Sequence, residues 1–94
     1  MNYRTESPQI LRDFLVYHET IQGHSKKTID EYFLDLRGFF RYIVASRNGL
    51  ELNIETVDQQ SIQSVDLPLV QSITLTDIYG YMSYLSREIG RAHV

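Results

Sequence analysis

The feature that most constrains this sequence is a stripe of apolar side chains between Ser25 and Asn48. The members of the stripe recur every three or four residues, the spacing of one face of an α-helix: Ile29, Tyr32, Phe33, Leu36, Phe40 and Ile43, with Phe39 at the edge. Ser25 is a residue type that caps helix N-termini, and Asn48-Gly49 is a pair that ends helices. The pattern therefore predicts a long helix over 25–47 with one buried face.

Two shorter helical patterns flank this long helix. In the first, Ser7 is predicted to cap the helix, Pro8 suits the first helical position, and Gly23 follows its end. The apolar residues of the first pattern are Ile10, Leu11, Phe14, Leu15 and Tyr17. In the second pattern, Thr76 is predicted to cap the helix and Gly90 to stop it. Its apolar residues are Ile78, Tyr81, Met82, Leu85 and Ile89.

The middle of the chain is less regular. From Leu50 to Val65, apolar residues are placed irregularly among polar ones, which predicts a long connection, with short extended pieces as the alternative. Asp66 and Pro68 then predict a short helix that runs to about Ser72. Together the patterns predict a small all-α bundle of about four helices. A chain of 94 residues suits one such domain, spanning 1–94.

Composition places the chain among globular proteins. Hydrophobic residues make up 43% and charged residues 22% of the sequence, which argues against disorder. The absence of cysteine excludes a disulfide framework and a cysteine metal site, and fits a reducing compartment. No apolar run approaches the roughly 18 residues that a membrane span needs, and residues 1–6 lack the hydrophobic stretch of a signal peptide. We therefore expect a cytoplasmic protein with no membrane association.

The sequence offers little for catalysis or metal binding. The three histidines, His18, His24 and His93, are scattered, and none forms a metal-binding pair four residues apart. None of the glycines belongs to a Gly-x-Gly phosphate loop. The tyrosines fall mostly on helical apolar stripes, so packing explains them better than a nucleophilic role. We predict no catalytic residue, no metal site and no cofactor.

The distribution of charge is more informative than the net charge of −3, which alone argues mildly against nucleic acid binding. Residues 25–47 hold five of the nine Lys and Arg residues, whereas residues 48–72 hold four acids and no base. A helical step of about 100° per residue places Lys26, Lys27, Arg37 and Arg41 on one flank of the long helix. Asp30 lies on the same flank and lowers its positive charge, because it can pair with Lys26. By charge alone, a solvated surface with Lys26–Asp30 and Lys27–Glu31 pairs is the better explanation.

The start of the long helix favours anion binding. Residues 23–28 place two hydroxyl groups, two ammonium groups and free backbone N–H groups at a helix N-terminus. The helix dipole favours an anion at this end, and phosphate is the usual ligand there. Ser25 also serves as an ordinary cap under either interpretation.

Three motifs in the same order resemble a known family. They are Pro8-x-x-Leu11-x-x-Phe14-Leu15, then Gly23-x-Ser25-x-x-Thr28-x-x-x-Tyr32-x-x-Asp35-Leu36-Arg37-x-Phe39-Phe40-x-Tyr42, then Ile73-Thr74-x-x-Asp77-Ile78-x-x-Tyr81-x-x-Tyr84-Leu85. Over about residues 8–88 the chain resembles the amino-terminal core-binding domain of Xer-type and phage-integrase tyrosine recombinases. The middle motif is the most specific of the three. The resemblance implies a SAM-like helical bundle.

The resemblance also implies a role. In that family this domain forms one arm of a clamp around double-stranded DNA, and a separate carboxy-terminal domain carries the catalytic residues. By resemblance, the residues that contact DNA are Ser25, Lys26, Lys27, Thr28, Arg37 and Arg41, and those of the core are Tyr32, Leu36, Phe39 and Phe40. The chain itself would be a non-enzymatic, monomeric piece of a recombinase whose full-length form associates with other recombinase subunits.

The main alternative is a helical protein–protein interaction module that does not bind DNA. SAM-like bundles serve that role too, and the acidic 51–66 segment and the net charge of −3 fit it. Salt-sensitive binding to duplex DNA separates the two hypotheses, because only phosphate contacts release counterions.

Overall fold

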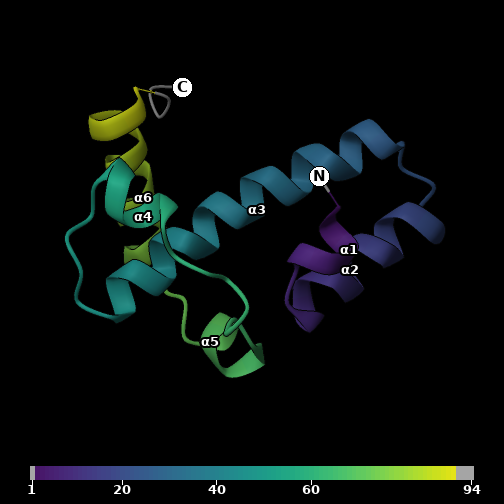
Figure 1. Cartoon of the computed structure of the whole chain (residues 1–94), viewed down its shortest axis with the longest axis horizontal. Coiled ribbons are helices and arrows are strands. Elements are labelled where there is room, and N and C mark those ends of the chain that lie inside the picture. The colour runs from purple at the N-terminus through teal and green to yellow at the C-terminus, as the bar shows by residue number, and fades with distance from the viewer. Residues whose placement is uncertain (1, 91–94) are drawn as a thin grey trace.

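The fold is built around one long central helix, α3 (Figure 1). The computed structural model describes residues 2–90 and contains no β-strand in that range, which confirms the all-α class. The helices are α1 (Tyr3–Glu6), α2 (Gln9–Thr20), α3 (Lys26–Arg47), α4 (Ile54–Asp58), α5 (Leu67–Gln71) and α6 (Leu75–Tyr84), and a π-helical turn, η1 (Leu85–Ile89), continues α6. The sequence had not predicted α1 and α4.

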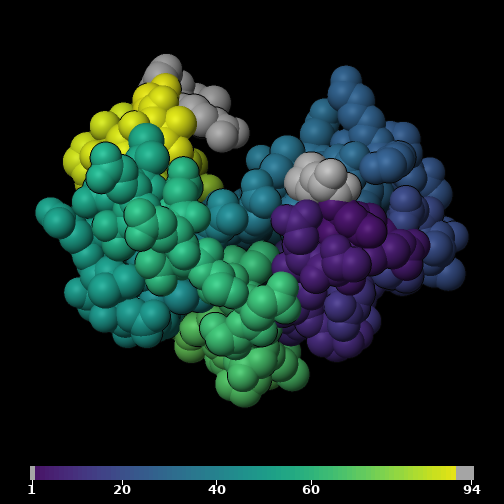
Figure 2. Space-filling view, viewed as in Figure 1, coloured from purple at the N-terminus to yellow at the C-terminus, as the bar shows by residue number. Residues whose placement is uncertain are grey.

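The two halves of α3 carry separate groups of helices. α1 and α2 lie along its first half, and α4 and α6 pack against its second half (Figure 1). Between the two groups the surface is hollowed, and the middle of α3 forms the floor of the hollow (Figure 2). Arg37 and Arg41, on this part of α3, therefore lie beside residues of both groups of helices.

Each half of α3 has its own apolar core. The first core joins the face of α2 to α3, where Leu15, Ile29 and Phe33 are fully buried. The second core joins α3 to α4 and α6 through Ile43, Val57 and Tyr84. Burial of a large apolar side chain contributes about 1.5–3 kcal/mol, and the stripe on α3 supplies buried side chains to both cores. The predicted stripe is confirmed.

The predicted ends of α3 are also confirmed. The Ser25 hydroxyl accepts a hydrogen bond from the backbone N–H of Thr28 at 3.2 Å, which caps the helix. At the other end, Gly49 has a φ of 68°, a left-handed conformation that favours glycine. Gly23, beyond the end of α2, has a φ of 71° for the same reason.

Two predicted N-caps are wrong. Ser7 does not cap α2, because it ends α1 instead, and its backbone N–H donates to the Tyr3 carbonyl at 3.0 Å. Pro8 is therefore the N-cap of α2 rather than its first residue. Thr76 does not cap α6, which begins two residues earlier in the chain than expected. Thr74 is the cap, because Asp77 lies three residues later and completes a capping box.

The expected long connection over 50–65 is corrected by α4. Asn53 caps this helix by accepting a hydrogen bond from the backbone N–H of Thr56 at 2.9 Å, and Val57 fixes it in the second core. A helix of five residues with one buried side chain is too short to produce a periodic pattern. The predicted α5 is confirmed, with Asp66 as its cap and Pro68 in its first turn.

The buried face of α6 differs from the predicted one. Tyr81 and Leu85 pack against the second core, and Tyr84, which belongs to the third motif but not to the predicted apolar face, is only 2% exposed. Tyr84 lies against Tyr42, with ring centroids 5.3 Å apart. The remaining predicted face residues of the last helix are exposed: Ile78, Met82 and Ile89. On α2, Phe14 and Tyr17 are likewise exposed.

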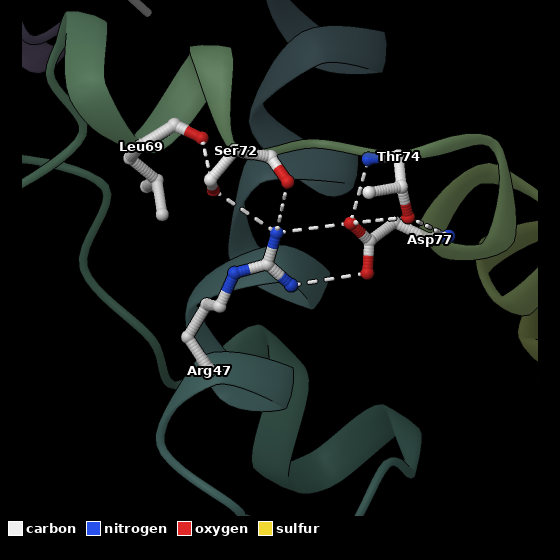
Figure 3. Close-up of polar contacts among 5 residues, drawn as sticks. All are labelled: Arg47, Leu69, Ser72, Thr74 and Asp77. Atoms are coloured by element: carbon white, nitrogen blue, oxygen red, sulfur yellow. Dashed lines mark hydrogen bonds and ion pairs between the residues drawn. The ribbon is translucent and has the colours of Figure 1, made fainter.

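An ion pair fastens the end of α3 to the start of α6 (Figure 3). Arg47 donates two hydrogen bonds to the Asp77 carboxylate, at 3.0 and 2.9 Å, and also reaches the backbone carbonyl of Ser72 at 3.2 Å. These bonds from Arg47, together with the backbone N–H of Thr74, hold the pKa of Asp77 well below its usual range. The Arg47 guanidinium therefore stabilises the fold by joining α3 to the start of α6.

Candidate nucleic-acid interface

All six residues predicted to contact DNA lie on or directly before α3, but they form two groups. The first group is at the N-terminus of the helix and consists of Ser25, Lys26, Lys27 and Thr28. The second group, Arg37 and Arg41, lies in the middle. At about 1.5 Å of rise per residue, Arg37 is roughly 16 Å along the axis from Lys26. The two groups therefore offer two separate points of contact for an anion.

In the first group, Ser25, Lys26 and Lys27 are exposed and Thr28 is partly buried. The Ser25 hydroxyl donates to the Thr28 hydroxyl at 3.0 Å while accepting from the Thr28 backbone, so the two side chains close the first turn. Lys26 pairs with Asp30 at 3.0 Å, as expected, yet its side chain is 77% exposed. The expected Lys27–Glu31 pair is not formed, and Lys27 makes no ion pair with any residue that the structure describes. Its ammonium group is thus available beside a helix N-terminus.

Aromatic side chains hold the turn that leads into α3. The backbone N–H of His24 donates to the His18 carbonyl at 3.1 Å, and the two imidazole rings lie 5.5 Å apart. The Tyr32 ring packs against both of them. His18 and His24 are therefore neighbours in space, although they looked scattered in the sequence, and His93 lies outside the described residues. Within residues 2–90, no cluster of three or more His, Asp or Glu side chains is arranged to hold a metal ion.

The second group lies in the hollow between the two halves of the molecule. Arg37 pairs with Glu6 of α1 at 3.5 Å, and its guanidinium lies 5.3 Å from the centroid of the Phe33 ring. Arg41 is half-buried, and its Nε atom is buried without a hydrogen-bond partner in the described part of the chain. Burial, and then the nearby charge of Arg37, lowers the pKa of Arg41. This group therefore carries a positive charge that the protein only partly neutralises.

The buried tyrosines serve packing. Tyr42 and Tyr84 belong to the second core, where burial raises the pKa of each phenol. Both hydroxyls therefore stay protonated at neutral pH, which disfavours a nucleophilic role.

In the described part of the chain, no helix has the length and apolar character needed to cross a lipid bilayer.

Comparison with known proteins identifies a relative of the chain. It is 37% identical over 81 residues to the tyrosine recombinase XerC of Caldanaerobacter subterraneus subsp. tengcongensis, a match that covers 86% of this chain and 23% of that protein. Over most of its length the chain is similar to a tyrosine recombinase. No protein-family profile matches the chain, and no solved structure matches it either. The chain spans about a quarter of the length of this recombinase.

The match confirms the family resemblance that the sequence motifs indicated. In the structure, Ser25 and Thr28 of the middle motif close the first turn of α3. The motif residues expected in the core are buried or partly buried there: Tyr32, Leu36, Phe39 and Phe40. The motif thus specifies both the start of the helix and its buried face. The basic residues of α3 lie outside this buried face: Lys26 and Lys27 are exposed, and Arg37 and Arg41 are partly buried.

The sequence missed two features of this surface. Glu6 was not predicted to meet Arg37, because α1 is too short for a periodic pattern and the contact spans 31 positions. The contact between His18 and His24 was missed because it depends on the path of the turn between α2 and α3. A glycine between two helical patterns predicts a tight turn there, but it does not reveal which side chains the turn brings together.

Proposed function

We propose that this chain is a single domain, spanning residues 1–94, that holds duplex DNA for a tyrosine recombinase. A separate carboxy-terminal domain would break and rejoin the strands, and the domain described here would supply no catalytic group. Its partners would be double-stranded DNA and the other recombinase subunits of the full-length protein, in the cytoplasm. We expect the isolated chain to be monomeric.

The observation that supports this proposal most strongly is the free ammonium group of Lys27 at the start of α3. A helix of 22 residues presents a substantial dipole, and backbone N–H groups at its N-terminus favour a phosphate. The exposed Lys26 and the hydroxyls of Ser25 and Thr28 lie on the same turn. Contacts of this kind position a protein on the DNA backbone and do not read the sequence of bases.

The basic flank is short and the net charge is −3, so we expect weak binding by the isolated chain. A Kd on the order of 10⁻⁴–10⁻⁶ M at physiological salt is typical of backbone contacts alone. The recombinase would gain further affinity from its second arm, because two linked sites bind DNA at a raised effective concentration.

A titration of labelled duplex DNA with matched variants tests the proposal. Lys27→Gln and Gln71→Glu each lower the net charge by one, but Gln71 is an exposed residue at the end of another helix, α5. We expect Lys27→Gln to weaken binding several-fold at about 50 mM salt and to reduce the salt dependence by about one phosphate contact, whereas Gln71→Glu has little effect. Equal effects of the two variants would contradict a contact at the N-terminus of α3.

An interaction module is the second candidate function, and one observation favours it. Apolar side chains of α6 and η1 are exposed on one side of the molecule, among them Leu75 at 61% and Tyr79 at 60%. Exposed apolar patches mark protein interfaces in many proteins. If the chain is such a module, the duplex titration shows no salt-sensitive binding, and Leu75→Ser abolishes association with a protein partner.

A further inference from the structure

Two apolar cavities adjoin each other along the seam between α2 and α3. Their volumes are about 170 and 290 Å³, and they share the side chains of Phe14 and Leu36. Phe14 is 43% exposed, although phenylalanine is a residue type that usually lies in a core. The first cavity is completed by Ile10, Leu11, Phe40 and Val70, and the second by His18, Tyr32 and Asp35. We call the two cavities together the α2–α3 groove.

The spacing of the two cavities matches that of side chains on a helix. On α2 the lining runs from Ile10 through Phe14 to His18, in steps of four residues. Four residues rise about 6 Å along a helix. Side chains at positions i and i+4 of another helix have a similar separation. The α2–α3 groove therefore fits two neighbouring apolar side chains of a helix that lies along α2.

The border of the groove on α3 is acidic. Asp35 lines the second cavity, and Glu31 lies one turn before it on the same side of α3. Both residues are exposed, and neither forms an ion pair with a residue that the structure describes. Arg37, which shares a different cavity with Asp35, is already paired with Glu6. This border therefore attracts positive charge and repels the phosphates of DNA.

We propose that the α2–α3 groove binds an amphipathic helix of a protein partner, in which apolar residues four positions apart are flanked by Lys or Arg. The apolar residues fill the two cavities, and the basic residues lie beside Glu31 and Asp35. Charge complementarity of this kind selects among partners that offer similar apolar faces. The groove contains none of the residues assigned to DNA binding, so this inference does not depend on the proposed function.

A second copy of this chain is a poorer occupant of the groove. The exposed apolar side chains of α6 include Leu75, Tyr79 and Met82, but α6 contains one acid and no Lys or Arg. α3 carries more of the basic residues than any other helix that the structure describes, yet its apolar stripe is buried in the two cores. A helix with an exposed apolar face and a basic border therefore has to come from another protein.

Chemical-shift mapping of the ¹⁵N-labelled chain tests the proposal with two synthetic helical peptides as probes. One peptide carries Leu residues four positions apart with Lys on both sides, and in the other peptide Glu replaces each Lys. We expect the Lys peptide to shift the backbone amides of residues 10–18 and 32–36 in a saturable manner. At about 50 mM salt it should bind about three- to tenfold more tightly than the Glu peptide.

Asp35→Lys is the most informative variant, because it predicts a gain. The reversed charge should weaken binding of the Lys peptide about two- to fivefold and tighten binding of the Glu peptide by a similar factor, which loss of the fold cannot produce. Glu51→Lys makes the same change of charge at an exposed residue outside the groove and should alter neither affinity more than about twofold. Phe14→Ala should weaken both peptides, whereas Tyr79→Ala on α6 should weaken neither.

Three results would overturn the proposal. The first is equal binding of the two peptides, or shifts confined to the exposed side of α6 and η1. The second is a duplex DNA that shifts residues 10–14, because the groove would then serve nucleic acid. The third is dimerisation of the chain, measured by sedimentation equilibrium, that Phe14→Ala abolishes, because the occupant would then be a second copy.

Discussion

Arg47 and Asp77 meet across 30 positions of the chain and join the C-terminus of α3 to the N-terminus of α6. Asp77 also completes the capping box with Thr74, so one carboxylate serves two interactions (Figure 3). The guanidinium of Arg47, the last residue of α3, is therefore occupied by a partner within the protein. The fold thus separates one structural arginine, Arg47, from Arg37 and Arg41, which remain in the hollow.

Replacement of Asp77 should destabilise the protein. Asp77→Ala removes both hydrogen bonds from Arg47 and half of the capping box, and we expect a loss of about 1–3 kcal/mol in the free energy of unfolding. Chemical denaturation monitored by circular dichroism measures this loss. Asp66→Ala, which removes an ordinary cap from the short helix α5, is the control and should cost about 1 kcal/mol or less. A smaller effect at Asp77 than at Asp66 would contradict the structure.

Stability should also depend on pH through the same carboxylate. The folded protein holds the pKa of Asp77 below its usual range, so folding favours the ionised form. The resulting stability is complete above the ordinary pKa of aspartate, about 3.9, and is lost as the pH falls through the lower folded pKa. We therefore expect the free energy of unfolding to drop below about pH 4, and Asp77→Asn to reduce the size of that drop. An unchanged pH profile in Asp77→Asn would argue against the ion pair.

A close approach of α6 to α3 makes glycine necessary at position 80. A Cβ atom added to Gly80 would lie 2.5 Å from the Tyr42 hydroxyl, whose ring is buried in the second core. Gly80→Ala should therefore destabilise the protein by about 1–3 kcal/mol, although alanine favours helices. In the double variant with Tyr42→Phe the hydroxyl is absent, and we expect most of the stability to return. Additive effects in this double-mutant cycle would refute the close contact.

The short helix α4 should contribute to stability despite its length. Val57 is its buried anchor, and Val57→Ala should cost about 1–3 kcal/mol because the second core gains a cavity. Ile54→Ala on the same helix removes apolar atoms from an exposed side chain and should cost about 0.5 kcal/mol or less. Thermal unfolding of the two variants compares them. Similar melting temperatures would mean that α4 is not docked.

The long helix could be predicted from the sequence because its apolar stripe repeats over many turns and both of its ends carry strong cap residues. Short elements could not. α1 and α4 each bury one side chain, Tyr3 and Val57, and a single apolar residue has no period. The start of α6 was misplaced because Thr74 and Thr76 are equally good caps by residue type, and only the position of Asp77 distinguishes them.

For the candidate site, the residue types were visible in the sequence but their partners were not. Lys26 and Asp30 are close on one helix, so their pair was predicted correctly. The contact of Arg37 with Glu6 and the burial of the Arg41 Nε atom depend on how distant segments pack. Periodicity places a residue on one side of a helix, but it does not reveal what a short flanking segment places against it.

The central claim is that the N-terminus of α3 faces DNA, and chemical-shift mapping of the ¹⁵N-labelled chain with a duplex tests it most directly. We predict that the backbone amides of residues 24–28 shift at about 50 mM salt and that these shifts shrink strongly at about 200 mM, because phosphate contacts release counterions. Shifts confined to the exposed side of α6 and η1, or shifts that do not depend on salt, would contradict the claim and favour the interaction module.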